Sequence, residues 1–139
     1  MSAWRRKAAA LFPDLMQEPS NRESLCLLFT ELVARTHQAH RTNDLAFLRR
    51  AYGFAEWCLL QPQKNLWNPA GVVFFEHILD DPSFEAEIIP WLSPEALATC
   101  WDLWSHIGPS RLERIRLALP CPRPRYPENV LHNGELAAL

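Results

Sequence analysis

The chain has 139 residues, of which 48% are hydrophobic, 11% aromatic and 22% charged. These values are typical of one globular domain with its own core, and they exclude a wholly disordered chain. Fourteen basic residues oppose sixteen acidic ones, so the chain lacks the strong positive charge of a general nucleic-acid-binding protein. Apolar runs such as residues 72–75 are too short to span a bilayer, so we expect no membrane segment.

Hydrophobic spacing predicts helices along the first 119 residues, because apolar side chains recur every three or four positions. The predicted helices cover residues 3–12, 20–40, 44–61, 68–79, 81–89, 93–107 and 109–119. We therefore expect an all-α fold of six or seven short helices, packed as an irregular bundle or a short helical-hairpin array. Residues 1–119 form one domain in this interpretation, and residues 120–139 form an extended, Pro-rich tail.

Capping residues predict where three of these helices begin. Ser20 and Glu23 match a capping box at the start of the second helix. Either Thr42 or Asn43 caps the third, and the Asn68-Pro69 pair is typical of a helix start.

The fourth predicted helix, over residues 68–79, is apolar nearly all round, so we expect it to be the central, most buried helix. The third carries two adjacent apolar stripes, which predict one wide buried face. Glu56 and Trp57 lie on the opposite side of that helix, which we expect to be polar.

The four cysteines are too far apart to form a zinc knuckle or a CxxC motif. Three of them fall within apolar helical patterns, where a free cysteine behaves as a small hydrophobe. We therefore expect reduced thiols and a cytoplasmic location.

Charge is distributed unevenly, because residues 65–110 contain seven acidic side chains and no Lys or Arg. These acids either form a solvated face that pairs with arginines of neighbouring helices, or they form a docking surface for a basic partner. The candidate partner-binding residues are Asp80, Asp81, Glu85 and Glu87 together with Trp57 and Trp91. The two tryptophans either fill gaps between helices or anchor the partner, since Trp is favoured at interface hot spots.

A second candidate site surrounds the Glu76-His77 pair, because His77 and Asp80 lie one helical turn apart. We interpret Glu56, Glu76 and His77 as structural polar residues. Arg35, Arg49 or Arg50 is the expected partner of Glu76. Alternatively, His77 with Asp80 or Asp81 and one of His37 or His40 forms a metal site.

Four segments carry a resemblance to known proteins: residues 52–58 (YGFAEWC), 66–68 (LWN), 74–77 (FFEH) and 89–94 (IPWLSP). They resemble an uncharacterised bacterial family of small helical proteins over roughly residues 2–119. This resemblance implies a helical, intracellular protein and assigns no catalytic residue.

From these features we expect a non-enzymatic protein-protein interaction module with an acidic docking surface. Such a module acts as an adaptor or neutralises a basic protein, with no cofactor and with its oligomeric state left open. The alternative is a metal-dependent enzyme with a His/carboxylate site around His77. Phosphate loops, GxSxG and HExxH motifs do not occur in the sequence.

Overall fold

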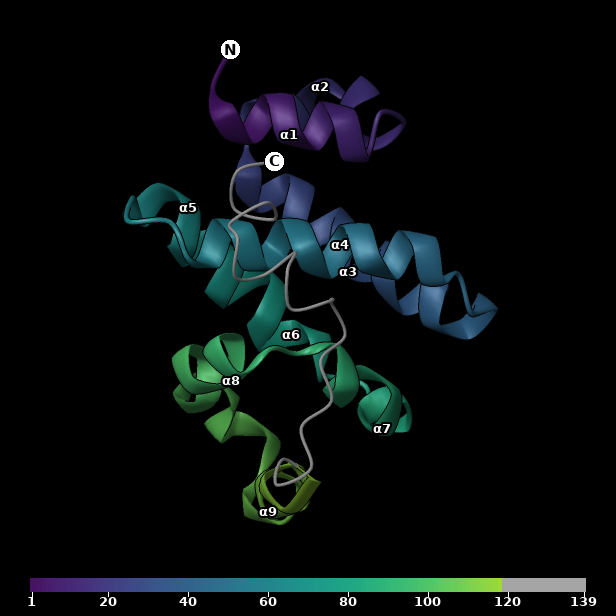
Figure 1. Ribbon diagram of the computed structural model, residues 1–139, viewed down its shortest axis with the longest axis vertical. Coiled ribbons are helices and arrows are strands. Elements are labelled where there is room, and N and C mark those ends of the chain that lie inside the picture. The colour runs from purple at the N-terminus through teal and green to yellow at the C-terminus, as the bar shows by residue number, and fades with distance from the viewer. Residues whose placement is uncertain (119–139) are drawn as a thin grey trace.

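A computed structural model describes residues 1–118, which form helices and no strand, so the predicted all-α fold is confirmed. The predicted tail, residues 120–139, lies outside the described residues. Figure 1 shows the helices stacked along the long axis, with α1 at one end and α9 at the other. None of the helices within residues 1–118 combines the length and the apolar character needed to cross a lipid bilayer.

Short helical segments follow one another along the whole described chain. In order they are α1 (Ala3–Leu11), η1 (Leu15–Gln17), α2 (Pro19–Glu23), α3 (Leu25–Thr42), α4 (Leu45–Leu59), α5 (Lys64–Pro69), η2 (Ala70–Phe75), α6 (Glu76–Ile78), η3 (Pro82–Phe84), α7 (Glu85–Ile88), η4 (Ile89–Trp91), α8 (Pro94–Cys100), η5 (Trp101–Ile107) and α9 (Pro109–Ala118). The segments labelled η are 3-10 helices, except for η2, which is a π-helix. The elements are shorter and more broken than predicted, because turns of three helix types alternate after residue 63.

The longest helices, α3 and α4, form an antiparallel hairpin in the middle of the molecule (Figure 1). The predicted capping box at Ser20 is wrong, because Ser20 lies inside α2 and Ser24 caps α3 by accepting the Leu27 N–H. Asp44 caps α4 by accepting the Phe47 N–H at 3.1 Å. Asn43 occupies the left-handed region at the end of α3, with φ 56°.

Helix α4 provides the central wall of the core, since every residue from Ala51 to Leu59 is buried. This corrects the expectation that residues 68–79 form the most buried helix. Glu56 and Trp57 also lie in the core, because α1 covers the side of α4 that the sequence pattern left to solvent. The Lys7 ammonium of α1 lies 4.6 Å from the centre of the Trp57 ring.

A continuous helical path runs from α5 through η2 into α6, with Pro69 inside it. The predicted helix start at Asn68-Pro69 is therefore wrong. Proline lacks an N–H donor and its ring crowds the carbonyl one turn earlier, so the regular ladder opens into a π turn. The Trp104 indole of η5 donates to the Phe75 carbonyl at 2.6 Å and joins this path to the C-terminal half.

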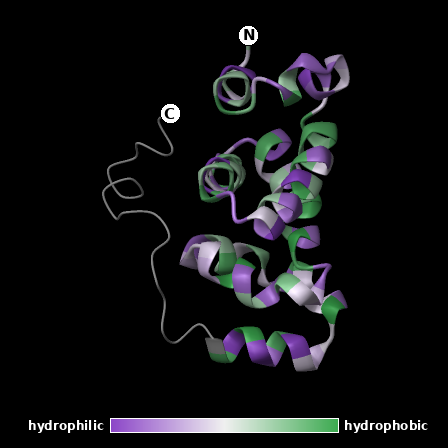
Figure 2. Cartoon of the chain, turned by 90° about the vertical axis from the view of Figure 1, so that its right-hand side faces the viewer, coloured by the Kyte–Doolittle hydropathy of each residue, from purple (hydrophilic) through white to green (hydrophobic). Residues whose placement is uncertain are grey.

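The C-terminal half continues from α6 through α7 and α8 to α9. Helix α9 follows a single connecting residue, Gly108, and forms the last layer of the described molecule (Figure 1). Figure 2 shows hydrophobic and hydrophilic residues alternating along α9. Its buried contact is Ile115, and Leu112 is half-buried beside it.

Candidate functional site

Glu85, a predicted partner-binding residue, is covered by two arginines of α9. Arg111 Nε donates to Glu85 Oε1 at 2.6 Å, and Arg114 Nε donates to Oε2 at 3.3 Å. The Glu85 side chain keeps only 13% of its surface exposed. Its charge is therefore used inside the molecule, as the pairing interpretation of the acidic segment expected.

Three other predicted residues, Asp80, Asp81 and Glu87, remain near the surface, and we call them the acidic surface. The side chain of Asp80 is 49% exposed and that of Glu87 is 57% exposed. Asp81 is half-buried and caps η3, where Ser83 donates to its Oδ1 through both hydroxyl and backbone N–H. These donors lower the pKa of the Asp81 carboxyl, with smaller contributions from His37 and Arg41.

The charge of Glu87 has a neutral neighbour rather than a cation. His40 Nδ1 lies 4.0 Å from Glu87 Oε2, and His40 Nε2 is hydrogen-bonded to the Tyr52 hydroxyl at 2.8 Å. Burial of the imidazole, followed by the effect of nearby His37, lowers the pKa of His40 to about 4. The ring is therefore uncharged at pH 7 and does not compensate the charge of the Glu87 carboxylate.

Phe84 connects the acidic surface to the end of α3. Its ring stacks near both His37 and His40, at centroid distances of 6.2 and 6.3 Å. The Arg41 guanidinium lies 5.4 Å from the same ring. Arg41 thus lies close enough to influence Asp81 electrostatically, but it forms no salt bridge with it.

His77 forms a polar cluster with residues from its own turn and from η5. Its Nδ1 lies 2.8 Å from Asp80 Oδ2 and its Nε2 lies 3.5 Å from Glu76 Oε2. His106 Nε2 reaches the other Asp80 oxygen at 3.5 Å. All four side chains are partly exposed, so the cluster is a surface network rather than a buried ion pair.

Within residues 1–118, Glu76 forms no salt bridge with any of its predicted partners, Arg35, Arg49 or Arg50. Arg35 forms a salt bridge with Asp14 at 2.8 Å, and the Arg50 guanidinium lies over the Phe47 ring. The expectation failed because the Glu76 side chain is 30% exposed, so its charge does not need a buried partner.

The histidines expected to complete a metal site point elsewhere. His37 Nε2 donates to the Ile78 carbonyl at 2.9 Å, and His40 is held by Tyr52. Within residues 1–118, no group of three or more His, Cys, Asp or Glu side chains is arranged to hold a metal ion. The ligand set of the alternative enzyme is thus not assembled by this part of the chain.

The two tryptophans proposed as partner anchors pack inside the molecule. Trp57 is a core residue, which corrects the expectation of an exposed anchor. Trp91 is half-buried and stacks on Tyr52, with ring centroids 5.5 Å apart and an interplanar angle of 13°. Both side chains fill spaces between helices, as the other interpretation of these residues predicted.

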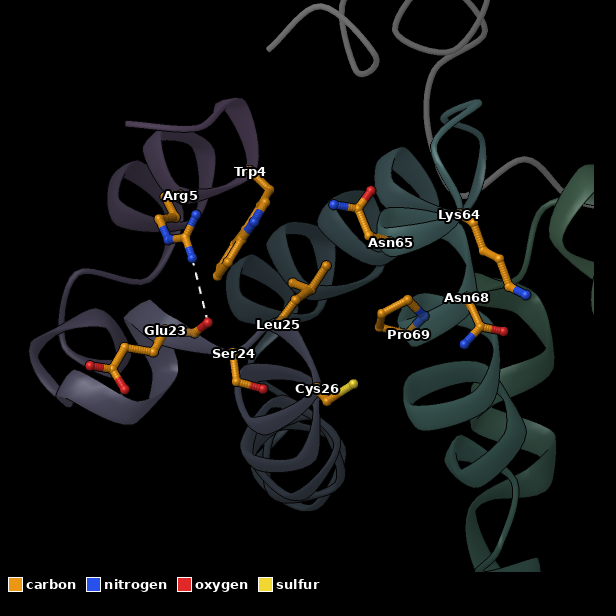
Figure 3. Close-up of a pocket in the computed structure, with 10 residues that line it drawn as sticks. All are labelled: Trp4, Arg5, Glu23, Ser24, Leu25, Cys26, Lys64, Asn65, Asn68 and Pro69. Carbon is orange, nitrogen blue, oxygen red and sulfur yellow. Dashed lines mark hydrogen bonds between the residues drawn. The ribbon is translucent and has the colours of Figure 1, made fainter.

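A groove that the sequence did not indicate lies where α1, the start of α3 and α5 meet (Figure 3). It has a volume of about 620 Å³ and is lined by residues that include Trp4, Arg5, Ser24, Cys26, Lys64 and Asn68. Arg5 already donates to the carbonyls of Arg22 and Glu23. The buried polar atoms without a hydrogen-bond partner in the described part, Lys7 Nζ and Arg50 Nε, are not in its lining. Within residues 1–118, the groove is therefore not marked by a buried polar atom that lacks a hydrogen-bond partner.

Comparison with known proteins identifies the family but no activity. A family model described as a domain of unknown function (DUF7674) matches residues 6–106, so the chain belongs to this family. The expected resemblance to an uncharacterised family is thus confirmed over a slightly shorter range. No curated protein and no solved structure matches the chain.

Proposed function

We propose that this member of the DUF7674 family is a non-enzymatic interaction module whose acidic surface docks a basic protein. One observation carries the proposal: among the described residues, Asp80, Asp81 and Glu87 form no salt bridge with Lys or Arg, although Glu85 between them does. The module acts either as an adaptor or as a neutralising partner.

Electrostatics give this surface a physical role. The segment 65–110 contributes seven negative charges and no Lys or Arg, and α9 offsets the charge of Glu85 alone. Carboxylates near the surface that form no salt bridge with Lys or Arg attract a basic partner over several ångströms, and the attraction weakens as salt screens it. Complementary charge of this kind accelerates encounter and selects the partner more than it adds affinity.

The proposed location is the cytoplasm, where thiols remain reduced. Cys58 and Cys100 are free thiols in the core, and Cys26 is a free thiol at the surface. Burial raises the pKa of Cys100 to about 12, and the pKa of Cys58 still further. Two of these thiols therefore serve as packing groups rather than as nucleophiles.

The test measures binding of a fluorescent nona-arginine peptide by anisotropy at about 50 mM salt. The variant D80N/E87Q removes two exposed charges while keeping side-chain shape. We expect it to weaken binding about fivefold, because each surface charge contributes roughly 0.5 kcal/mol.

The matched control is E18Q/E23Q, which removes two charges at the other end of the molecule. Neither Glu18 nor Glu23 forms an ion pair within the described residues. The control should bind within twofold of wild type. If both variants bound the peptide equally weakly, the loss of affinity would follow from net charge alone. That result would refute a localised docking surface.

A further inference from the structure

We propose that α9 is a built-in ligand that covers Glu85, and that the basic partner competes with α9 by presenting an arginine-bearing helix. The inference rests on the proposed function, because it assumes that the segment 65–110 receives a basic partner. It adds the chemical class of the partner and a means by which the chain limits its own binding.

The contact between α9 and the rest of the domain has the geometry of a recognition site. Arg111 Nε donates to Glu85 Oε1 at 2.6 Å while its Nη2 donates to the Leu79 carbonyl at 2.7 Å. One guanidinium thus bridges a carboxylate of α7 and the carbonyl that follows α6. Arg114 adds a second guanidinium on the same carboxylate. Such forked donation is the way arginine recognises carboxylates across interfaces.

The apolar part of this contact is small. Ile115 is fully buried and Leu112 is half-buried, whereas Leu117 keeps 62% of its surface exposed. Within its described residues 109–117, this helix is held by one fully buried side chain, one half-buried leucine and two arginines, so it can detach without opening the main core. The linker favours such movement, since Gly108 alone connects η5 to α9.

The binding site on Glu85 and the helix that occupies it, α9, belong to different parts of the chain. Leu79 and Glu85 lie within the residues that match the family, 6–106, whereas the whole of α9 lies beyond them. Helix α9 carries three arginines and one glutamate, so it brings positive charge to the segment that has no Lys or Arg. Helix α9 therefore carries the positively charged side chains that a basic partner would need in order to bind this segment.

The arrangement predicts the pattern of the competing helix. Two arginines three residues apart, with an apolar residue directly after the second, reproduce Arg111, Arg114 and Ile115. Release of α9 would uncover Glu85 between Asp81 and Glu87 and enlarge the acidic surface by one carboxylate. A partner that needs Glu85 can bind only those molecules in which α9 has left this residue. Its apparent affinity is therefore lowered in proportion to the fraction of such molecules.

The experiment uses the full chain and a fluorescent peptide with the sequence of residues 108–118. The variant R111Q/R114Q removes the groups that hold α9 on Glu85. We expect it to bind the peptide at least tenfold more tightly than wild type at about 50 mM salt. Adding E85Q to this variant should remove the gain.

The control variant R49Q/R116Q has the same net charge as R111Q/R114Q. Arg49 is exposed, and Arg116 pairs with Glu113 within α9 rather than with Glu85. The control should bind the peptide within twofold of wild type. Equal peptide binding by wild type and R111Q/R114Q would overturn the inference.

A second measurement avoids variants and therefore does not depend on their folding. In the ¹⁵N-labelled wild-type chain, saturating unlabelled peptide should move the amide signals of residues 109–118 to positions typical of a detached segment. Bound peptide with unmoved α9 signals would overturn the competition. If nona-arginine binding depends on Asp80 and Glu87 but the α9 peptide gains nothing from R111Q/R114Q, the proposed function stands and this inference fails. If R111Q/R114Q gains affinity for the α9 peptide but D80N/E87Q leaves nona-arginine binding unchanged, the competition with α9 stands and the proposed acidic surface fails.

Discussion

Lys7 places a cation in the core of the N-terminal half. Its side chain is only 6% exposed, and its Nζ has no hydrogen-bond acceptor among the described residues. Desolvation lowers the pKa of the ammonium. The Trp57 ring beneath it offsets part of this cost through a cation-π contact.

We predict that Lys7→Met stabilises the fold by about 1 kcal/mol, because an apolar side chain of similar length removes the desolvation cost. Urea denaturation at pH 7 measures the difference. Arg6→Met is the control on the exposed side of α1 and should change stability by less than about 0.5 kcal/mol. A less stable Lys7→Met would mean that the contact with Trp57 outweighs the cost of burial.

His40 gives the molecule a pH-dependent stability. Its pKa is about 4 in the folded chain, against an ordinary value of 6.5. Between these two values the unfolded chain binds a proton that the folded chain does not bind, so stability falls as pH decreases. The loss from this residue between pH 7 and pH 4 reaches up to about 3 kcal/mol.

Denaturation curves at several pH values test the His40 prediction. The substitution His40→Gln should make the decline between pH 7 and pH 4 shallower. His106→Gln, at an exposed histidine, should keep the slope of wild type. Parallel slopes for wild type and His40→Gln would show that the buried imidazole is not the source.

At the scale of helices, two glycines have opposite structural roles. Gly71 lies in the π turn, where an added Cβ would meet Leu103 Cδ1 at 3.4 Å and Leu59 Cδ1 at 3.8 Å. These are ordinary contacts with movable side chains. Gly108, between η5 and α9, has φ 95° and ψ 152°, a conformation that side chains make costly.

Alanine substitutions at the two glycines should therefore change stability in opposite directions. Gly71→Ala should stabilise by about 0.5–1 kcal/mol, because alanine loses less backbone entropy in a helix. Gly108→Ala should destabilise by about 1–3 kcal/mol through backbone strain. Thermal melts of both variants beside wild type show whether each substitution raises or lowers stability. A destabilised Gly71→Ala would mean that the Leu103 side chain cannot move away from the added Cβ.

Helix positions were predictable from hydrophobic spacing, whereas several helix ends were not. Ser20 and Ser24 both fit a cap, and only the packing of α2 decides that Ser24 is used. Pro69 is equally compatible with the first turn of a helix and with a kink inside a helix. The interior position is tolerated because the π turn and the contacts of η2 with α3 offset the lost hydrogen bond.

At the scale of the whole molecule, the sequence indicated which residues carry charge but not which residues lie across from them. The pattern of α4 could not show that α1 covers Trp57, since the two helices are about 40 residues apart in sequence. Likewise, Glu85 is neutralised by arginines 26 and 29 residues later. Asp80 and Glu87 stay exposed, since no Lys or Arg among residues 1–118 forms a salt bridge with either of them.

The central claim is that the acidic surface attracts a basic partner, and the association rate of the nona-arginine peptide tests it most directly. We expect the rate to fall at least tenfold between about 25 and 300 mM salt, since screening removes electrostatic steering. D80N/E87Q should associate more slowly than wild type and with a shallower salt dependence. A rate that is independent of salt, or equal in wild type and D80N/E87Q, would contradict the account.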